Sequence, residues 1–254
     1  PYSVWFRKRF SISSIPPDNN VFIRFYGVKF HCVIYVNGHD VGEHWDGFSP
    51  FMVNITNVVK YNSENELLVF VEDWRSMLQG VNKERAKDVY DLHDAIAYPI
   101  GSQYTNYGIW DSVEIVILPK VWISDVFVMT SVRLRNITVR VEVRNDDIFK
   151  REIVVVNRIY DHGRLAKELK NITVTIPAKS SLTVNITEGW EDPHLWSPDD
   201  PHLYVLKTII VDKNGNVIDE KRTRFGFREF WIVGDSFYLN GKHVILRATG
   251  CHPL

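Results

Sequence analysis

Phe237-Tyr-Leu-Asn-Gly-Lys-His-Val-Ile-Leu-Arg247, close to the end of the 254-residue chain, has the pattern of a β-hairpin. Two runs that favour β-strands, 237–239 and 243–247, flank Asn240-Gly241. Asn and Gly both accept the positive φ that the two central positions of a tight hairpin turn require. The second run continues to His252, and we therefore expect it to be the first strand of a further domain.

A second Asn-Gly pair, Asn37-Gly38, predicts another hairpin in the first half of the chain, because residues on both sides of it alternate between apolar and polar. Other runs with strand character in this half are 4–13, 21–26, 51–55, 66–71 and 112–118. Short antiparallel strands at this spacing, without helical periodicity between them, predict a β-sandwich or jelly roll.

The second half of the chain contains another series of predicted strands. After Pro119–Trp122, which we interpret as a linker, they cover 123–130, 137–144, 151–160, 172–176, 181–186, 203–212 and 217–225. Turn-forming residues separate them, and about seven strands in roughly a hundred residues are typical of an immunoglobulin-like sandwich. The predicted fold class is therefore all-β.

Composition excludes several classes of partner. The chain has 30 basic and 31 acidic residues, and a net charge of -1 argues against nucleic-acid or membrane-surface binding through global charge. No apolar run reaches the roughly eighteen residues of a membrane span. The two cysteines, Cys32 and Cys251, fall in different predicted domains, so the sequence defines no disulfide framework.

The sequence does not decide whether the protein is cytoplasmic or secreted. The sequence begins at Pro1 and not at Met, so any preceding signal peptide is out of view. The triplet Asn-Ile-Thr occurs at Asn54, Asn136, Asn171 and Asn185, and it matches the glycosylation acceptor pattern. A chain rich in Asn, Ile and Thr also produces such triplets by chance.

Motifs along the whole chain resemble glycoside hydrolase family 2, which includes β-galactosidases, β-glucuronidases and β-mannosidases. They are Tyr35-Val-Asn-Gly38, Asp46-Gly-Phe-Ser-Pro-Phe51, Asn65-Glu-Leu-Leu-Val69, Leu195-Trp-Ser-Pro198, Gly226-Phe-Arg228, Leu239-Asn-Gly-Lys242 and Arg247-Ala-Thr-Gly-Cys-His252. Ala248 and Gly250 depart from the Gly and Asn of the family pattern, and Pro253 stands where an acidic residue is common. The resemblance implies a jelly-roll sugar-binding domain over 1–119, an immunoglobulin-like sandwich over 120–228 and the start of a catalytic (β/α)8 barrel over 229–254.

The long gap between Trp74 and Tyr107 is the most informative part of the first domain, because loops of this length inside a compact domain are usually functional or disordered. In the family, the equivalent excursion helps to shape the substrate pocket. The resemblance implies these substrate-binding residues: Ser102, Tyr104, Asn106 and His252. Ser102 stands where β-galactosidases and β-glucuronidases commonly have an Asp, and a hydroxyl supplies no fixed charge.

Other aromatic residues also offer flat faces to a sugar, although packing in the core or in a loop is the simpler explanation for each of them. They are Trp45, Trp74 and Trp110. Of all these aromatic residues, Tyr104 is the best candidate for contact with a sugar, because it lies in the long segment between Trp74 and Tyr107.

No catalytic residue is expected in this chain. Retaining glycosidases need two carboxyl groups about 5 Å apart, and in the family both are glutamates near later barrel strands, the first preceded by Asn. The only Asn-Glu pair, Asn65-Glu66, falls in a predicted core strand. We also expect no cofactor and no metal, since Cys251-His252 has no second ligand at a suitable spacing.

The sequence thus predicts the non-catalytic amino-terminal portion of a retaining β-glycosidase, of β-galactosidase or β-glucuronidase type, with a carbohydrate substrate as partner. Two alternatives remain, a stand-alone carbohydrate-binding or adhesion module and a purely structural surface protein. A homo-oligomer is left open.

Overall fold

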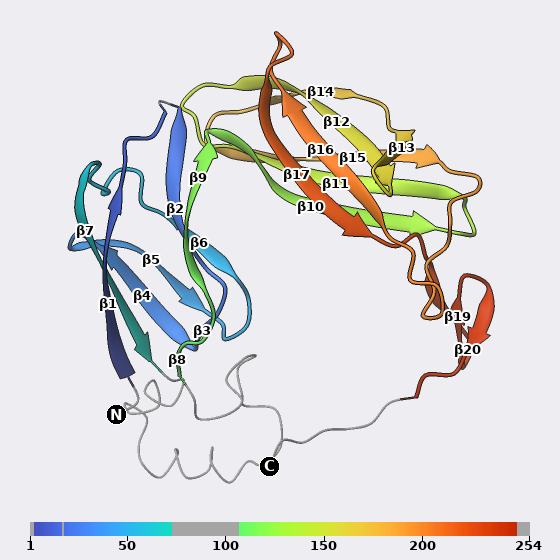
Figure 1. Cartoon of the computed structure of the whole chain (residues 1–254), viewed down its shortest axis with the longest axis horizontal. Helices are drawn as coiled ribbons and strands as arrows, with labels where there is room; N and C mark the ends of the chain where they lie inside the picture. The colour runs from blue at the N-terminus through green and yellow to red at the C-terminus, as the bar shows by residue number, and fades with distance from the viewer. Residues whose placement is uncertain (1–2, 17, 73–106, 248–254) are drawn as a thin grey trace. The chain divides into compact units, whose positions relative to one another are not determined.

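The computed structural model describes residues 3–16, 18–72 and 107–247 (Figure 1). All regular elements in these ranges are β-strands, which confirms the predicted all-β class. The described residues include no apolar helix of the length that a membrane span requires. The chain divides into two compact units, unit 1 over Pro1–Leu118 and unit 2 over Pro119–Leu254.

The described residues of unit 1 form three sheets. The largest has the order β1-β7-β4-β5 (Figure 1), with β1 at Ser3–Ile12, β7 at Ser63–Glu72, β4 at His31–Val36 and β5 at His39–Trp45. The second has the order β6-β2-β9, with β6 at Phe51–Asn54, β2 at Asn19–Phe25 and β9 at Val113–Pro119. The third is a short pair of β3 at Val28–Lys29 and β8 at Gly108–Ile109.

The core of unit 1 follows from the alternation of its strands, which sends every second side chain to the same face. On β4, Cys32, Ile34 and Val36 are fully buried, and they join one apolar cluster with residues of β2 and β7. The turn at Asn37-Gly38 has the positive φ values predicted from the sequence, 52° and 82°.

Unit 2 is a sandwich of two sheets with a small third sheet. One sheet has the order β10-β11-β15, with β10 at Val121–Ser131, β11 at Asn136–Asn145 and β15 at Ser180–Gly189. The other has the order β13-β12-β16-β17, with β14 also paired to β12. Its bounds are β12 Arg151–Asp161, β13 Arg164–Glu168, β14 Ile172–Ile176, β16 Tyr204–Val211 and β17 Val217–Phe225. Apolar residues of β11 and β12 meet in one core between the sheets.

The third sheet of unit 2 has the order β18-β19-β20, with β18 at Phe230–Val233, β19 at Ser236–Leu239 and β20 at Lys242–Val244. The Asn240-Gly241 hairpin is confirmed, with φ values of 52° and 85°. Asn240 ties it to the sandwich, because its Nδ2 donates to the carbonyl of Trp196 at 2.9 Å.

Two sequence predictions need correction. The strand predicted over 243–247 ends at Val244, because no strand among the described residues pairs with 245–247. The linker predicted over Pro119–Trp122 is shorter than expected, since β10 begins at Val121. Trp122 is 7% exposed, and its Nε1 donates to Asp146 at 2.8 Å, so it belongs to the sandwich. The sequence also did not predict four short strands, β3, β8, β13 and β18.

Candidate functional site

The substrate-binding residues predicted from the sequence, Ser102, Tyr104, Asn106 and His252, lie outside the described residues, as does Trp74. The structure does describe residues on both sides of segment 73–106. Before it, the carbonyl of Glu72 accepts a hydrogen bond from the Phe30 amide at 3.2 Å. After it, Gly108 pairs with Lys29. The chain therefore leaves β7 and returns to β8 at one corner of unit 1, formed by residues 29 and 30.

An open cleft of about 260 Å³ lies at this corner. Its lining, which we call the aromatic cleft, consists of Lys29, Phe48, Tyr107, Gly108, Ile109 and Trp110. Phe48 and Trp110 are about half exposed, at 52% and 54%, and their rings meet edge to face with centroids 6.1 Å apart. Exposed aromatic faces beside polar groups suit the apolar faces and hydroxyls of a sugar.

Trp110 is held in place from two sides. Its Nε1 donates to the carbonyl of Gly47 at 2.8 Å, and its amide donates to the carbonyl of Gly27 at 3.1 Å. The indole lies so close to residue 27 that a Cβ atom there would overlap the ring. Residue 27 must therefore be glycine for this indole position, and the ring is presented to the cleft by a fixed backbone.

The loop that carries Phe48 is shaped by Asp46. The carboxylate accepts hydrogen bonds from the amides of Phe48 at 2.9 Å and Ser49 at 3.2 Å, which forms a turn typical of Asp. Burial acts to raise the pKa of Asp46, but the hydrogen bonds from Ser49, Phe48 and Gly47 outweigh it and hold the pKa below its usual value. The carboxylate therefore stays charged and the turn stays closed at neutral pH.

A row of three polar and aromatic side chains crosses β5, β4 and β7 at the same corner. His31 is paired in register with Trp45 on one side and Glu72 on the other. Its ring stacks on Trp45 with centroids 3.7 Å apart, and its Nδ1 lies 2.6 Å from Glu72 Oε1. Its Nε2 lies 3.3 Å from Glu43 Oε2. The row fixes Trp45, which is 46% exposed, next to two carboxylates.

Sequence reasoning identified Trp45 and Trp110 as candidates but missed Phe48 and His31. For His31, the information missing from the sequence was the register in which β4 pairs with β5. A bulge between Ile34 and Tyr35 shifts the pairing by one residue, and only this shift places His31 opposite Trp45.

Asn65-Glu66, the only Asn-Glu pair of the sequence, is structural. It lies in β7, as the sequence predicted. Asn65 is 1% exposed, and its Oδ1 accepts hydrogen bonds from Asn37 Nδ2 at 2.8 Å and the Lys60 amide at 2.7 Å. Glu66 accepts a hydrogen bond from Arg7 Nε at 2.7 Å on the surface.

Groups that could ligate a metal occur in unit 2. Among the described residues, Asp161, His162 and His202 form the one group of three His, Cys, Asp or Glu side chains with a ligand spacing.

The fold defines the class: an all-β protein whose first unit is galactose-binding-like and whose second unit is a two-sheet β-sandwich. Residues 2–110 match the family model described as glycosyl hydrolase 2 galactose-binding domain-like. Residues 121–228 match the model described as glycosyl hydrolases family 2. The chain belongs to glycosyl hydrolase family 2.

Named relatives agree with this assignment. The chain is 27% identical to a β-glucuronidase of Formosa agariphila, over 99% of the chain and 26% of that protein. It is 30% identical to a β-galactosidase of Thermoanaerobacterium thermosulfurigenes, over 92% of the chain and 31% of that protein. The crystal structure of a Bacteroides uniformis β-glucuronidase superposes with a TM-score of 0.75 at 23% identity, over 94% of the chain and 28% of that structure. The chain thus spans about a quarter to a third of the length of the relatives that it matches.

Proposed function

We propose that this chain is the non-catalytic amino-terminal portion of a retaining β-glycosidase that hydrolyses the O-glycosyl bonds of terminal β-linked sugars. The observation that carries the proposal is the alignment of nearly the whole chain with relatives named β-glucuronidase and β-galactosidase. The substrate of the whole enzyme is then a β-galactoside or a β-glucuronide. The hydrogen bonds of buried Asn65 to Asn37 and Lys60, and the surface pair of Glu66 with Arg7, support a scaffold role for these two residues. The catalytic glutamates then belong to another part of the enzyme.

Within this enzyme, the task of unit 1 is to hold segment 73–106 at the substrate pocket. The hydrogen bond of Glu72 and the pairing of Gly108 support this role, because they anchor both ends of the segment on residues 29 and 30. Ser102, Tyr104, Asn106 and His252 remain our candidates for contact with the sugar.

The test compares two proteins. One is the 254-residue chain, and the other is the product of its source gene read beyond the codon for Leu254. We expect the gene to encode roughly three hundred further residues with an Asn-Glu pair and a later Glu. The longer protein should hydrolyse 4-nitrophenyl β-galactoside or β-glucuronide, and the 254-residue chain should hydrolyse neither. Turnover by the 254-residue chain, or a stop codon directly after Leu254, contradicts the proposal.

The second candidate is a stand-alone carbohydrate-binding module, and the aromatic cleft favours it. This candidate predicts that the 254-residue chain binds mono- or oligosaccharides by itself, which isothermal titration calorimetry measures. Trp110→Ala should remove such binding. Trp5→Ala is the matched control, because Trp5 is 57% exposed but lies in β1, outside the cleft. No binding by the wild-type chain favours the glycosidase portion over the module.

A further inference from the structure

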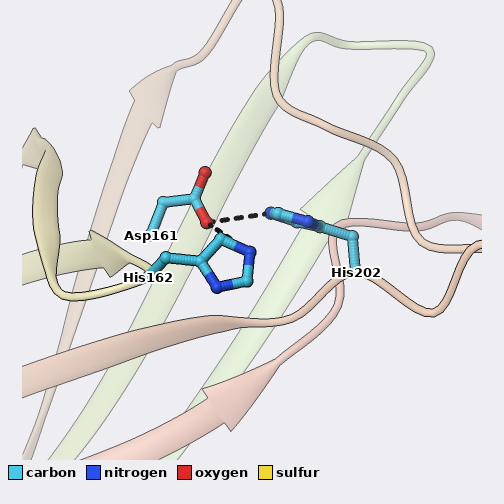
Figure 2. A group of neighbouring side chains, drawn as sticks. All are labelled: Asp161, His162 and His202. Atoms are coloured by element: carbon cyan, nitrogen blue, oxygen red, sulfur yellow. Dashed lines mark ion pairs between the residues drawn. The ribbon is translucent and has the colours of Figure 1, made fainter.

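Two segments that lie forty residues apart in the sequence meet at one end of the unit 2 sandwich (Figure 2). Asp161 is the last residue of β12, and His162 follows it in the turn to β13. His202 lies two residues before β16. Figure 2 shows the imidazole of His202 directed at the carboxylate of Asp161, with His162 beside them.

The polar atoms at the centre of this group lie close together but lack hydrogen-bond partners of good geometry within the described ranges. Asp161 Oδ1 lies 3.1 Å from His202 Nε2 and 3.7 Å from His162 Nε2. The His202 side chain is only 10% exposed. Despite the short distance, neither Asp161 Oδ1 nor His202 Nε2 has a hydrogen-bond partner of acceptable geometry among the described residues. Burying polar atoms without such a partner lowers the stability of a fold. A ligand that binds both atoms would remove this loss.

A metal ion would satisfy both atoms at once. The three ligand atoms all lie within 4.8 Å of one another. Zinc–nitrogen and zinc–oxygen bonds of about 2.0–2.2 Å in a tetrahedron place neighbouring ligand atoms roughly 3.3–3.5 Å apart. The Asp161–His202 and Asp161–His162 separations fall on either side of this value. His162 is 85% exposed, so its side chain is free to make the remaining adjustment.

The surroundings hold the His202 ring in one orientation, as a ligand requires. His194 stacks on it with centroids 4.1 Å apart, and Tyr204 meets it edge-on at 4.8 Å. His194 is itself fixed, since its Nε2 lies 2.6 Å from Asp200 Oδ2 and its amide donates to the Tyr204 hydroxyl at 2.8 Å.

We propose that Asp161, His162 and His202 form a binding site for a divalent transition-metal ion of the zinc type. Two imidazole nitrogens and one carboxylate oxygen suit Zn²⁺, Co²⁺ or Ni²⁺, whereas Ca²⁺ and Mg²⁺ prefer oxygen ligands alone. Water completes the coordination on the exposed side of His162. The ion cross-links the β12–β13 turn to the segment before β16 and so stabilises this end of the sandwich.

The test uses the 254-residue chain without a histidine tag, freed of metal with EDTA and dialysed. Calorimetry with ZnCl₂ should give one ion per chain, and zinc should raise the midpoint of thermal unfolding. Co²⁺ should give the visible absorption of a tetrahedral site. His202→Ala and Asp161→Asn should abolish all three effects, and His162→Ala should weaken binding by about tenfold or more.

The control is His243→Ala, because His243 is an exposed histidine of the same unit outside the group. It should bind zinc as the wild type does. Asp161→Asn preserves side-chain volume, and circular dichroism checks that each variant is folded. The proposal is overturned if the wild-type chain binds no zinc, or if folded Asp161→Asn and His202→Ala bind it with wild-type affinity.

Discussion

Trp196 lies against Gly226 so closely that a Cβ atom at residue 226 would approach the Cβ of Trp196 to 2.7 Å. The amide of Trp196 donates to the carbonyl of Phe227 at 2.9 Å, and its carbonyl accepts from Asn240. The guanidinium of Arg228 lies over the indole, 4.3 Å from its centre. One tryptophan therefore joins the segment before β16, the Gly-Phe-Arg motif and the β19–β20 hairpin, which is a structural role.

Replacing Gly226 with alanine should destabilise unit 2. The new methyl group meets Cβ and Cγ of Trp196, which cannot swing away without moving the backbone. We expect a loss of about 1–3 kcal/mol in the free energy of unfolding, measured by urea denaturation. Gly189→Ala is the matched control, since its nearest neighbour is 3.9 Å away. If the two variants had the same free energy of unfolding, the close contact between residue 226 and Trp196 would not limit the stability of unit 2.

Glu229 should make the stability of unit 2 depend on pH. Burial acts to raise its pKa, but hydrogen bonds from Arg133 and Ser131 prevail and hold the pKa below the ordinary value of 4.5. A carboxyl group with a lowered folded-state pKa contributes stability that is present above its unfolded-state pKa and is lost as pH falls through the folded-state value. The free energy of unfolding should therefore decrease with acidification below about pH 4.5.

Glu229→Gln tests this dependence, because glutamine does not titrate. The variant should be less stable at pH 7 and should lose less stability on acidification. Glu191→Gln is the control, since Glu191 is 76% exposed and pairs with Arg135 on the surface. If the free energy of unfolding fell equally with acidification in the wild type and in Glu229→Gln, Glu229 would not be the source of the pH dependence.

Cys32 should be unreactive while unit 1 is folded. Burial raises the pKa of its thiol to about 12, and a hydrogen bond with the backbone of His44 lowers it only in part. The thiolate is the reactive form, so the folded thiol should resist Ellman's reagent at pH 8. The assay uses Cys251→Ser, which leaves Cys32 as the sole cysteine, and urea should expose it. Fast labelling without urea would show that β4 opens readily.

The sequence predicts those parts of the fold that neighbouring residues determine, and it fails where residues far apart in the chain determine the structure. Asn37-Gly38 and Asn240-Gly241 are tight turns because two adjacent residues supply both positive φ values, and a sequence shows this directly. Strand β13 was missed because it pairs only with β12, and Arg164–Glu168 carries a weak apolar pattern.

The candidate sites were less predictable because distant residues build them. Asp161 and His202 come together through the pairing of β12 with β16, and no local pattern encodes that meeting. His31 meets Trp45 only because of a bulge, and an unbulged hairpin would place His44 there. The family resemblance supplied what these local rules could not, namely that the first unit is of the sugar-binding type, and residues 2–110 match a galactose-binding-like family model.

Asn65→Asp and Glu66→Gln should separate the structural and catalytic interpretations of the Asn-Glu pair. Asn65 Nδ2 donates to the carbonyl of Lys60 at 2.8 Å, and a carboxylate cannot make this donation. We therefore expect Asn65→Asp to lower the free energy of unfolding of unit 1 by about 2–4 kcal/mol. Glu66→Gln loses only a surface pair with Arg7, and it should change the stability by less than about 1 kcal/mol. In the longer protein of the source gene, Glu66→Gln should leave the turnover of 4-nitrophenyl glycosides unchanged. A loss of several orders of magnitude would instead make Glu66 a catalytic residue and overturn the assignment of this chain as non-catalytic.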